Sequence, residues 1–84
     1  SKDTEDQNDA YTAAKTIYEK FLKKYPKSDL VPQAQFGIAS CLEELDELKE
    51  AYEAYQLLKA TYPSPQVIEI KMARISERMN QRSR

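Results

Sequence analysis

The 84-residue sequence contains no histidine and no tryptophan, and it has a single glycine and a single cysteine. One cysteine cannot form an internal disulfide, so the redox environment cannot be inferred from it. The lack of histidine removes the most common general base and metal ligand of proteins. With one glycine and four prolines, the turn-rich patterns of β-sandwiches and barrels are missing. These scarcities argue against a histidine-based active site, a metal site and an all-β fold, and we expect no cofactor.

The charge balance and the hydrophobic pattern exclude two further classes of partner. The formal net charge is −1, which gives no overall attraction to nucleic acid or to an anionic membrane. No apolar run approaches the roughly 20 residues that a membrane span needs. We therefore expect one small domain that neither binds nucleic acid nor inserts into a membrane.

Most of the chain has the pattern of amphipathic helices. Residues 1–9 are polar and acidic, which predicts a disordered lead-in. From Ala10 onward, apolar residues recur every three or four positions, which is the helical period. The first predicted helix runs from Ala10 to Pro26, since the residue before a proline disfavours helical backbone. The sequence thus predicts a helical domain over residues 10–84.

Prolines and capping residues indicate three further helices in this domain. The second helix is expected to be capped by Ser28 or Asp29, with Pro32 in its first turn. A break at residues 45–46 follows, where Asp46 would cap the third helix. The third helix is expected to end at Tyr62–Pro63, and the fourth to start at Ser64–Pro65. The fourth helix is expected to fray among residues 81–84. The domain therefore has four predicted helices joined by short turns.

An internal repeat is the strongest signal in the sequence. The segment YEKFLKKYP at residues 18–26 aligns with YQLLKATYP at residues 55–63, a spacing of 37 residues. Upstream, Ala14 aligns with Ala51 at the same spacing. Repeats of this length are typical of helical solenoids, in which one helix pair cannot bury its apolar face alone and packs on the next pair.

Small residues, an aromatic residue and a closing proline at these positions resemble the tetratricopeptide repeat (TPR), a pair of antiparallel helices. The residues that carry the resemblance are Ile38, Ala39, Leu42, Ala51, Tyr55 and Pro63, with Ala14, Tyr18 and Pro26 in an earlier half-repeat. The sequence departs from the family at Gln35, where the motif has tryptophan, and in exceeding the usual repeat of about 34 residues. The resemblance implies an all-α fold, a short right-handed α-solenoid of about four antiparallel helices with one full repeat flanked by two half-repeats. It also implies a non-enzymatic scaffold that binds a protein or a peptide.

The extra length of the repeat lies in the linker KSDLVPQA, residues 27–34. This linker resembles those in TPRs of bacterial envelope proteins, such as the Tol-Pal-associated coordinator and the outer-membrane assembly lipoproteins. The resemblance implies a periplasmic or cell-envelope location and a role in an envelope assembly.

The only glycine and the only cysteine lie together in the segment FGIASC, residues 36–41. A reactive thiolate needs a base or positive surroundings, whereas Cys41 has Glu43 and Glu44 close by, and negative charge raises the pKa of a thiol. Small residues let two helix backbones approach closely, while a glycine inside a helix otherwise costs about 1 kcal/mol. We therefore predict close helix packing at this segment and no catalysis.

By resemblance to TPR arrays, the first helices of the repeats line a concave face that binds the partner. This face would contain Gln33, Phe36, Gly37, Ser40, Glu43 and Glu44 from the second helix, and Val67, Ile70, Lys71, Arg74 and Arg78 from the fourth. Phe36 lies beside the apolar stripe of its helix. It therefore either lines a groove for a peptide or packs against the fourth helix through Ile70.

Two charged surfaces also have alternative interpretations. Arg74, Arg78 and Arg82 form a basic stripe, and Glu43, Glu44, Asp46, Glu47 and Glu50 form an acidic block. Together they are either a docking surface for a charged partner or a solvated face with weak salt bridges of about 0–1 kcal/mol each.

The first predicted helix carries apolar residues on nearly all sides. One side is expected to pack on the second and third helices, which leaves a surface around Tyr11, Leu22 and Tyr25 for self-association or for another partner. A homo-oligomerisation module that works through this helix is therefore an alternative to the peptide-binding scaffold, and an enzyme that uses Cys41 is a third hypothesis.

Overall fold

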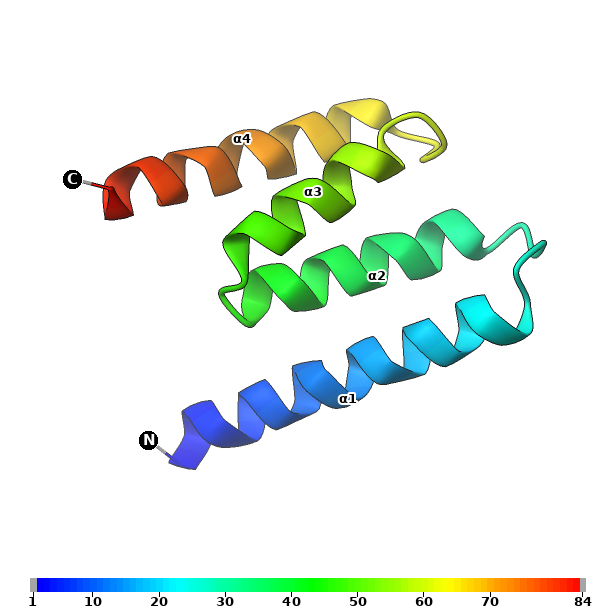
Figure 1. Ribbon diagram of the computed structural model, residues 1–84, viewed down its shortest axis with the longest axis horizontal. Helices are drawn as coiled ribbons and strands as arrows, with labels where there is room; N and C mark the ends of the chain where they lie inside the picture. The colour runs from blue at the N-terminus through cyan, green and yellow to red at the C-terminus, as the bar shows by residue number, and fades with distance from the viewer. Residues whose placement is uncertain (1, 84) are drawn as a thin grey trace.

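The structure, a computed structural model, describes residues 2–83 and contains four α-helices (Figure 1). The helices are α1 (Lys2–Lys24), α2 (Val31–Glu44), α3 (Leu48–Leu58) and α4 (Pro65–Arg82). No strand occurs between residues 2 and 83. The predicted all-α helical-repeat fold is therefore confirmed.

Successive helices run antiparallel and pack side by side in chain order, so α1 and α4 form the two opposite edges of the stack (Figure 1). Helices α1 and α3 run in one direction, and α2 and α4 run in the other. The stack measures 41 × 31 × 15 Å. In such a thin layer, an inner helix has a neighbour on each side, whereas an edge helix has one side without a neighbouring helix.

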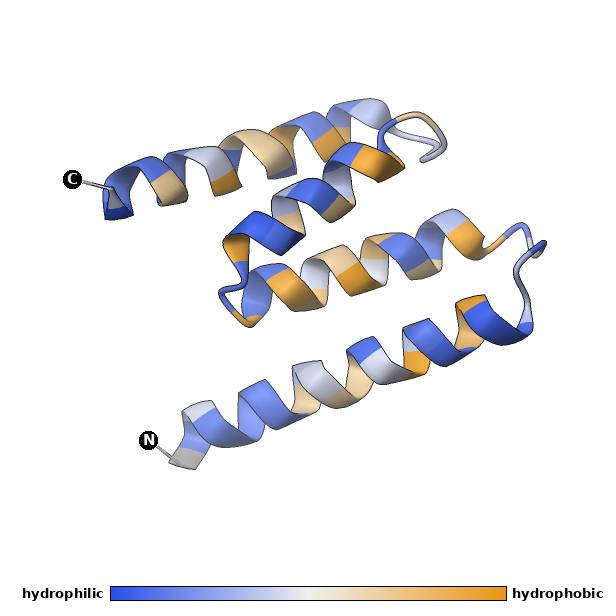
Figure 2. Ribbon diagram, in the orientation of Figure 1, coloured by the Kyte–Doolittle hydropathy of each residue, from blue (hydrophilic) through white to orange (hydrophobic). Residues whose placement is uncertain are grey.

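The hydrophobic core lies between α2, α3 and α4. Figure 2 shows hydrophobic and hydrophilic residues alternating along each helix, which is the pattern of amphipathic helices. The largest fully buried side chains are Tyr55, Leu58, Ile68 and Ile75. Helix α3 supplies buried residues from its first turn to its last, at Leu48, Ala51, Tyr55 and Leu58. Burial of these side chains fixes α3 as the central helix of the core.

Prolines mark the helix limits as predicted. Helix α1 ends at Lys24, just before Tyr25 and Pro26. Pro32 lies in the first turn of α2, and Pro65 is the first residue of α4. At these positions the missing N–H of proline would have had no partner within the helix.

Two helix ends differ from the prediction. Helix α1 begins at Lys2 and not at Ala10, so residues 2–9, predicted as a disordered lead-in, are helical in the structure. Asp3 and Glu5 lie in the first turn, where negative charge interacts favourably with the helix dipole. Helix α3 ends at Leu58, although the prediction placed its end at Tyr62.

The turn between α2 and α3 corrects the predicted role of Asp46. This residue has a positive φ of 66° and follows the end of α2. Its N–H donates to the Glu43 carbonyl, and the next N–H, of Glu47, donates to the Leu42 carbonyl. This pair of bonds is a Schellman motif, which ends a helix. Asp46 therefore terminates α2, and Glu47 occupies the N-cap position of α3.

The predicted side-chain caps of α2 and α4 are also corrected. The N-cap position of α2 is Leu30, and no side chain caps it. The hydroxyl of Ser28 instead accepts the Leu30 N–H at 3.1 Å, within the preceding turn. Ser64 does occupy the N-cap position of α4, but its side chain makes no cap hydrogen bond. Proline in the first turn therefore marks these helix starts more reliably than the serines do.

Candidate functional site

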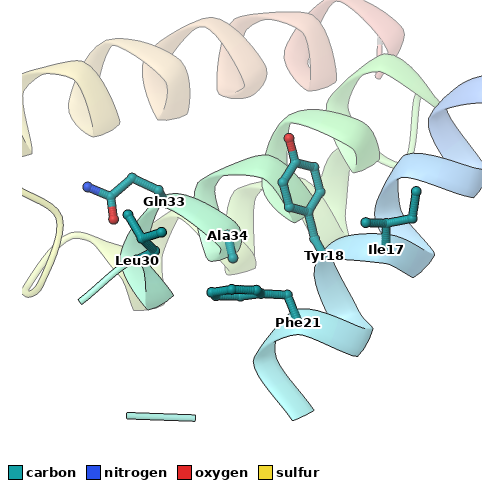
Figure 3. A pocket seen from close by; sticks show the side chains of 6 residues that line it. All are labelled: Ile17, Tyr18, Phe21, Leu30, Gln33 and Ala34. Atoms are coloured by element: carbon teal, nitrogen blue, oxygen red, sulfur yellow. The ribbon is translucent and has the colours of Figure 1, made fainter. Parts of the chain in front are cut away.

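A groove runs between α1 and α2 and consists of two hollows that share Tyr18 and Gln33. The first hollow has a volume of 340 Å³ and is lined by Ile17, Tyr18, Phe21, Leu30, Gln33 and Ala34 (Figure 3). The second has a volume of 370 Å³ and is lined by Tyr11, Ala14, Tyr18, Gln33, Phe36, Gly37, Ser40, Cys41 and Glu44. The two hollows together are termed the α1–α2 groove below.

The floor of the groove is formed by close contact between Tyr18 and Gly37. A Cβ atom added at Gly37 would lie 2.5 Å from Cε2 and Cζ of the Tyr18 ring, which is shorter than any real contact. The ring therefore rests directly on the α2 backbone, and a side chain at position 37 would force the ring to shift. The close contact predicted at the FGIASC segment is therefore present at Gly37, but the Tyr18 side chain of α1 makes it, and not a second helix backbone.

Apolar side chains of the first hollow remain open to solvent. Figure 3 shows the rings of Tyr18 and Phe21 extending from α1 toward α2, with Leu30 and Ala34 on the α2 side. Ile17 is 66% exposed and Leu30 is 57% exposed. Large apolar side chains this exposed and this close together are typical of a surface that binds another protein.

The structure brings together five of the eleven residues predicted to line the concave face that binds a partner. They are Gln33, Phe36, Gly37, Ser40 and Glu44, all in the second hollow. Tyr11, predicted for self-association, lies in the same hollow. The α2 part of the predicted concave face and part of the predicted α1 surface are therefore one groove.

The other predicted self-association residues lie outside the groove. Leu22 is half-buried, and Tyr25 is 48% exposed. The Tyr25 ring packs against Phe21, with a centroid distance of 5.3 Å, and Lys24 Nζ lies 5.5 Å from its centroid. These contacts hold Tyr25 at the end of α1.

Phe36 contributes both to the groove and to the core. Its ring stacks on Tyr62 with a centroid distance of 4.9 Å and meets Tyr55 edge-on at 5.6 Å. Ile70, the contact that the packing alternative named, is 59% exposed. Phe36 therefore packs against α3 and the turn after it, and it lines the groove with only part of its surface.

Glu43, predicted on the concave face, is instead a buried part of the α2–α3 contact. It is 5% exposed and accepts a hydrogen bond from the Tyr55 hydroxyl at 3.0 Å. Ser40 Oγ lies 3.0 Å from the same hydroxyl and donates to it, since the single Tyr55 proton is given to Glu43. Burial raises the pKa of the Tyr55 hydroxyl, the Ser40 bond lowers it, and the Glu43 charge raises it further. The carboxylate also pairs with Lys71 Nζ of α4 at 3.8 Å, so this network links three helices.

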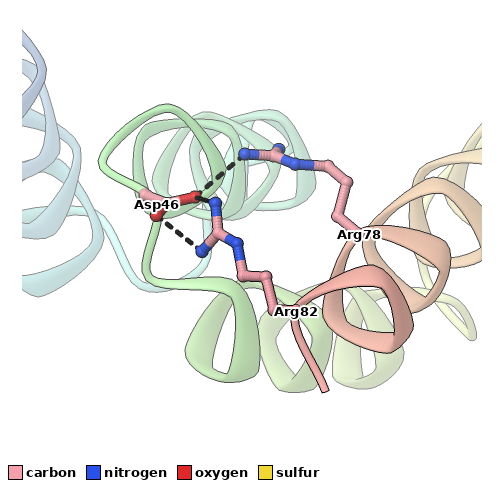
Figure 4. A network of polar contacts seen from close by, with 3 residues as sticks. All are labelled: Asp46, Arg78 and Arg82. Carbon is pink, nitrogen blue, oxygen red and sulfur yellow. Dashed lines mark hydrogen bonds and ion pairs between the residues drawn. The ribbon is translucent and has the colours of Figure 1, made fainter. Parts of the chain in front are cut away.

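The predicted basic stripe on α4 divides into a paired part and an open part. Arg78 and Arg82 both donate to the Asp46 carboxylate, at distances of 2.6 to 2.9 Å (Figure 4). The Arg82 hydrogen bond lowers the pKa of Asp46. Arg74 is exposed on the same helix. The weak-salt-bridge alternative therefore describes Arg78 and Arg82.

Cys41 is buried at the base of the second hollow. Burial raises the pKa of its thiol, Lys15 lowers it, and Glu44 raises it. The dominant cause is therefore desolvation, and of the two predicted acidic neighbours only Glu44 contributes. A thiol kept protonated in this way is a poor nucleophile.

Among the described residues, no group of three or more histidine, cysteine, aspartate or glutamate side chains has the arrangement of a metal site. None of the helices in the described part of the chain is both long and apolar enough to cross a membrane.

Sequence reasoning assigned only Gln33 of the first hollow to a partner surface and missed the other five residues: Ile17, Tyr18, Phe21, Leu30 and Ala34. Tyr18 was used only as a landmark of the repeat. The alignment of Tyr18 with Tyr55 could have indicated that Tyr18 is exposed. Tyr55 is covered by α2, whereas no helix precedes α1 among residues 2–83 to cover Tyr18 in the same way.

Comparison with known proteins identifies the family. A family model described as tetratricopeptide repeat matches residues 5–28, within α1 and the turn after it, and residues 33–65, from α2 to the start of α4. No curated protein and no solved structure gave a match. The two matched segments cover more than half of the chain and agree with the helix pairing in the structure. The chain therefore belongs to the tetratricopeptide repeat family, whose repeats are non-enzymatic scaffolds for protein–protein interaction.

Proposed function

We propose that this chain binds a segment of a partner protein in the α1–α2 groove. One observation carries the proposal: residues predicted for partner binding on α2 line the same groove as the half-exposed aromatic side chains of α1. Binding in the groove would cover Ile17, Tyr18 and Leu30, and the hydrophobic effect favours that burial.

The lining of the groove defines the chemistry of the bound segment. The first hollow is apolar, and Glu44 lies in the second. The first half of α1, next to the second hollow, carries Asp3, Glu5, Asp6 and Asp9, all exposed. We infer that the preferred segment is an amphipathic helix whose apolar stripe fills the groove and whose basic end lies beside the acidic half of α1.

Site-specific photo-crosslinking tests this function. A photoreactive amino acid at Gln33, an exposed position that lines both hollows, should crosslink a protein in cells of the native organism. The matched control is the same amino acid at Leu57 of α3, which is 85% exposed and outside the groove. The Ile17→Lys change should abolish the crosslink at Gln33. Crosslinks of equal yield from both positions, or products unaffected by Ile17→Lys, would contradict binding in the groove.

We propose in addition that the chain acts within a bacterial envelope assembly, in the periplasm or at the cell envelope. Support for this comes from the KSDLVPQA linker at residues 27–34 and its resemblance to the linkers of envelope TPRs. Fractionation of the native cells with an antibody against this chain tests the location. Recovery in the cytosolic fraction alone would contradict it.

A further inference from the structure

The α1–α2 groove has the same composition as a surface that is already filled elsewhere in the molecule. The groove residues of α1 are Tyr11, Ala14, Tyr18 and Phe21. Exactly 37 positions later stand Leu48, Ala51, Tyr55 and Leu58, which are the four buried residues of α3. Helices α1 and α3 are therefore equivalent elements of the repeat. They differ in that α2 buries this face of α3, while the same face of α1 stays partly exposed along the groove, with Tyr18 37% exposed.

Helix α2 shows what kind of helix fits such a face. It covers Tyr55 with Phe36, which contacts the ring edge, and with Ser40 and Glu43, which bond to the hydroxyl. A second helix with the required pattern must therefore present an apolar side chain and, four and seven positions later, polar groups that reach a tyrosine hydroxyl.

Helix α4 has this pattern, and it is exposed. The repeat aligns α4 with α2 at a spacing of 34 residues, which places Ala34 opposite Ile68. At this spacing Phe36, Ser40 and Glu43 correspond to Ile70, Arg74 and Glu77. All three α4 residues are exposed, and Ile70 is 59% exposed. The free side of α4 thus carries the groups that would fill the groove of α1.

The charges of the two faces are complementary. A helix that lies on α1 as α2 lies on α3 runs antiparallel to it, so its C-terminal half meets the N-terminal half of α1. The exposed first half of α1 is acidic at Asp3, Glu5, Asp6 and Asp9. The C-terminal half of α4 carries Arg74, Arg78 and Arg82 against Glu77 and against the Asp46 carboxylate that Arg78 and Arg82 share, which leaves a net charge of +1. A symmetric contact between two α1 helices would instead bring some acidic residues of both copies near each other.

We propose that α4 of one copy of this chain binds in the α1–α2 groove of a second copy, in a head-to-tail arrangement. The inference rests on the proposed function and assigns its partner. Ile70 of the first copy packs against Tyr18 of the second, and the Tyr18 hydroxyl donates to Glu77 as Tyr55 donates to Glu43.

The fold requires this contact to form between copies, and it allows further copies to add at both ends. Helices α1 and α4 lie at opposite edges of one stack (Figure 1), so α4 cannot reach the groove of its own copy. Every bound copy offers a new groove and a new α4. A contact between two different surfaces produces chains or rings and does not stop at a symmetric dimer.

Sedimentation velocity with two complementary variants tests the arrangement. Ile17→Lys blocks the groove, and Ile70→Lys blocks the α4 face; both side chains are more than half exposed, so neither change disturbs the core. The wild-type chain should form species larger than dimers as its concentration rises from about 10 μM to about 1 mM, a range that detects weak association. Each variant alone should remain a monomer. An equimolar mixture of the two should form a 1:1 heterodimer that grows no further, since only one intact groove and one intact α4 face remain.

A control variant and two outcomes that would contradict the arrangement complete the test. Leu57→Lys, on the most exposed large apolar side chain, should assemble as the wild-type chain does. A wild-type chain that is monomeric at about 1 mM would overturn the inference, and so would Ile70→Lys assembling as well as wild type. If Gln33 then still crosslinks another protein, the proposed function stands and self-assembly alone fails. If the chain is monomeric and Gln33 yields no crosslink, both fail.

Discussion

Helices α1 and α3 are equivalent in sequence and differ in their surroundings. Tyr55 of α3 is 0% exposed, with its hydroxyl bonded to Ser40 and Glu43. Tyr18, its counterpart 37 positions earlier, is 37% exposed and rests on Gly37 with one side of its ring. The same residue in the same repeat position is thus a core residue in one helix and a surface residue in the other.

This difference shows which part of a repeat is determined by its own sequence. A TPR helix presents an apolar stripe, but the stripe is buried only when a neighbouring helix covers it. Within residues 2–83, α3 lies between two neighbours and α1 has one. The groove on α1 is therefore the partly uncovered counterpart of the α2–α3 contact.

The largest difference in stability is expected between the variants that lack the Tyr55 hydroxyl and the Tyr18 hydroxyl. Tyr55→Phe leaves the 5% exposed Glu43 carboxylate without its hydroxyl donor, and an unsatisfied buried polar group costs about 1–3 kcal/mol. Tyr18→Phe should change the free energy of unfolding by less than about 0.5 kcal/mol, as is usual for surface positions. Urea unfolding of both variants, followed by circular dichroism, measures the difference.

A third variant verifies that the Tyr55 effect comes from Glu43. In a Glu43→Gln background the buried charge is gone, so Tyr55→Phe should be less harmful than it is in the wild-type chain. Equal losses for Tyr55→Phe and Tyr18→Phe would mean that the two helices do not differ as the structure shows.

A smaller effect, with a change of sign, is expected at Gly37. In the wild-type chain Gly37→Ala pushes the added Cβ into the Tyr18 ring. Overpacking costs about 1–3 kcal/mol, and alanine returns about 1 kcal/mol through its higher helix propensity, so a net loss of about 1 kcal/mol is expected. In a Tyr18→Ala background the ring is absent, and Gly37→Ala should stabilise the chain by about 1 kcal/mol. Chemical denaturation of the four combinations measures both signs.

The result at Gly37 distinguishes two explanations of the only glycine. If Gly37→Ala stabilises the wild-type chain as well, the Tyr18 ring moves aside without penalty, and the glycine is not required for the contact between α1 and α2. The loss in the wild-type background is thus the informative measurement.

The fold could be predicted from the sequence because local signals agree with one another. The 37-residue spacing of Tyr18 and Tyr55, with prolines at 26 and 63, fixes both the helix pairing and the family. Helix ends that have no nearby proline were harder to predict from the sequence. The residue type of Asp46 predicts an N-cap. Its positive φ and its Schellman hydrogen bonds instead depend on how α2 ends, and the residue type alone does not determine that.

The site could be predicted only in part, for a physical reason. Gln33, Gly37 and Ser40 were assigned to the partner face from their helix position, and they do line the groove. Glu43 lies on the same helix, yet it is buried because Tyr55 and Lys71 reach it from two other helices. Whether a polar residue is a surface group or a buried partner depends on contacts between distant residues, and a single sequence does not specify them.

The smallest effect is expected where the end of α4 contacts Asp46, in the turn between α2 and α3. Asp46→Asn keeps a residue that tolerates a positive φ and removes the charge that Arg78 and Arg82 share. Because the pKa of Asp46 is lowered in the folded state, its stabilising effect is complete above the unfolded pKa of about 3.9. It is lost as the pH falls through the lower folded pKa.

Thermal unfolding at pH 7 should therefore show a midpoint lower by a few degrees at most in the Asp46→Asn variant, since exposed ion pairs contribute little. The two midpoints should converge as the pH falls through the lowered folded pKa of Asp46, and also at high salt, where exposed charges are screened. A difference that persists in acid would show that Asp46 acts through the turn geometry and not through its charge.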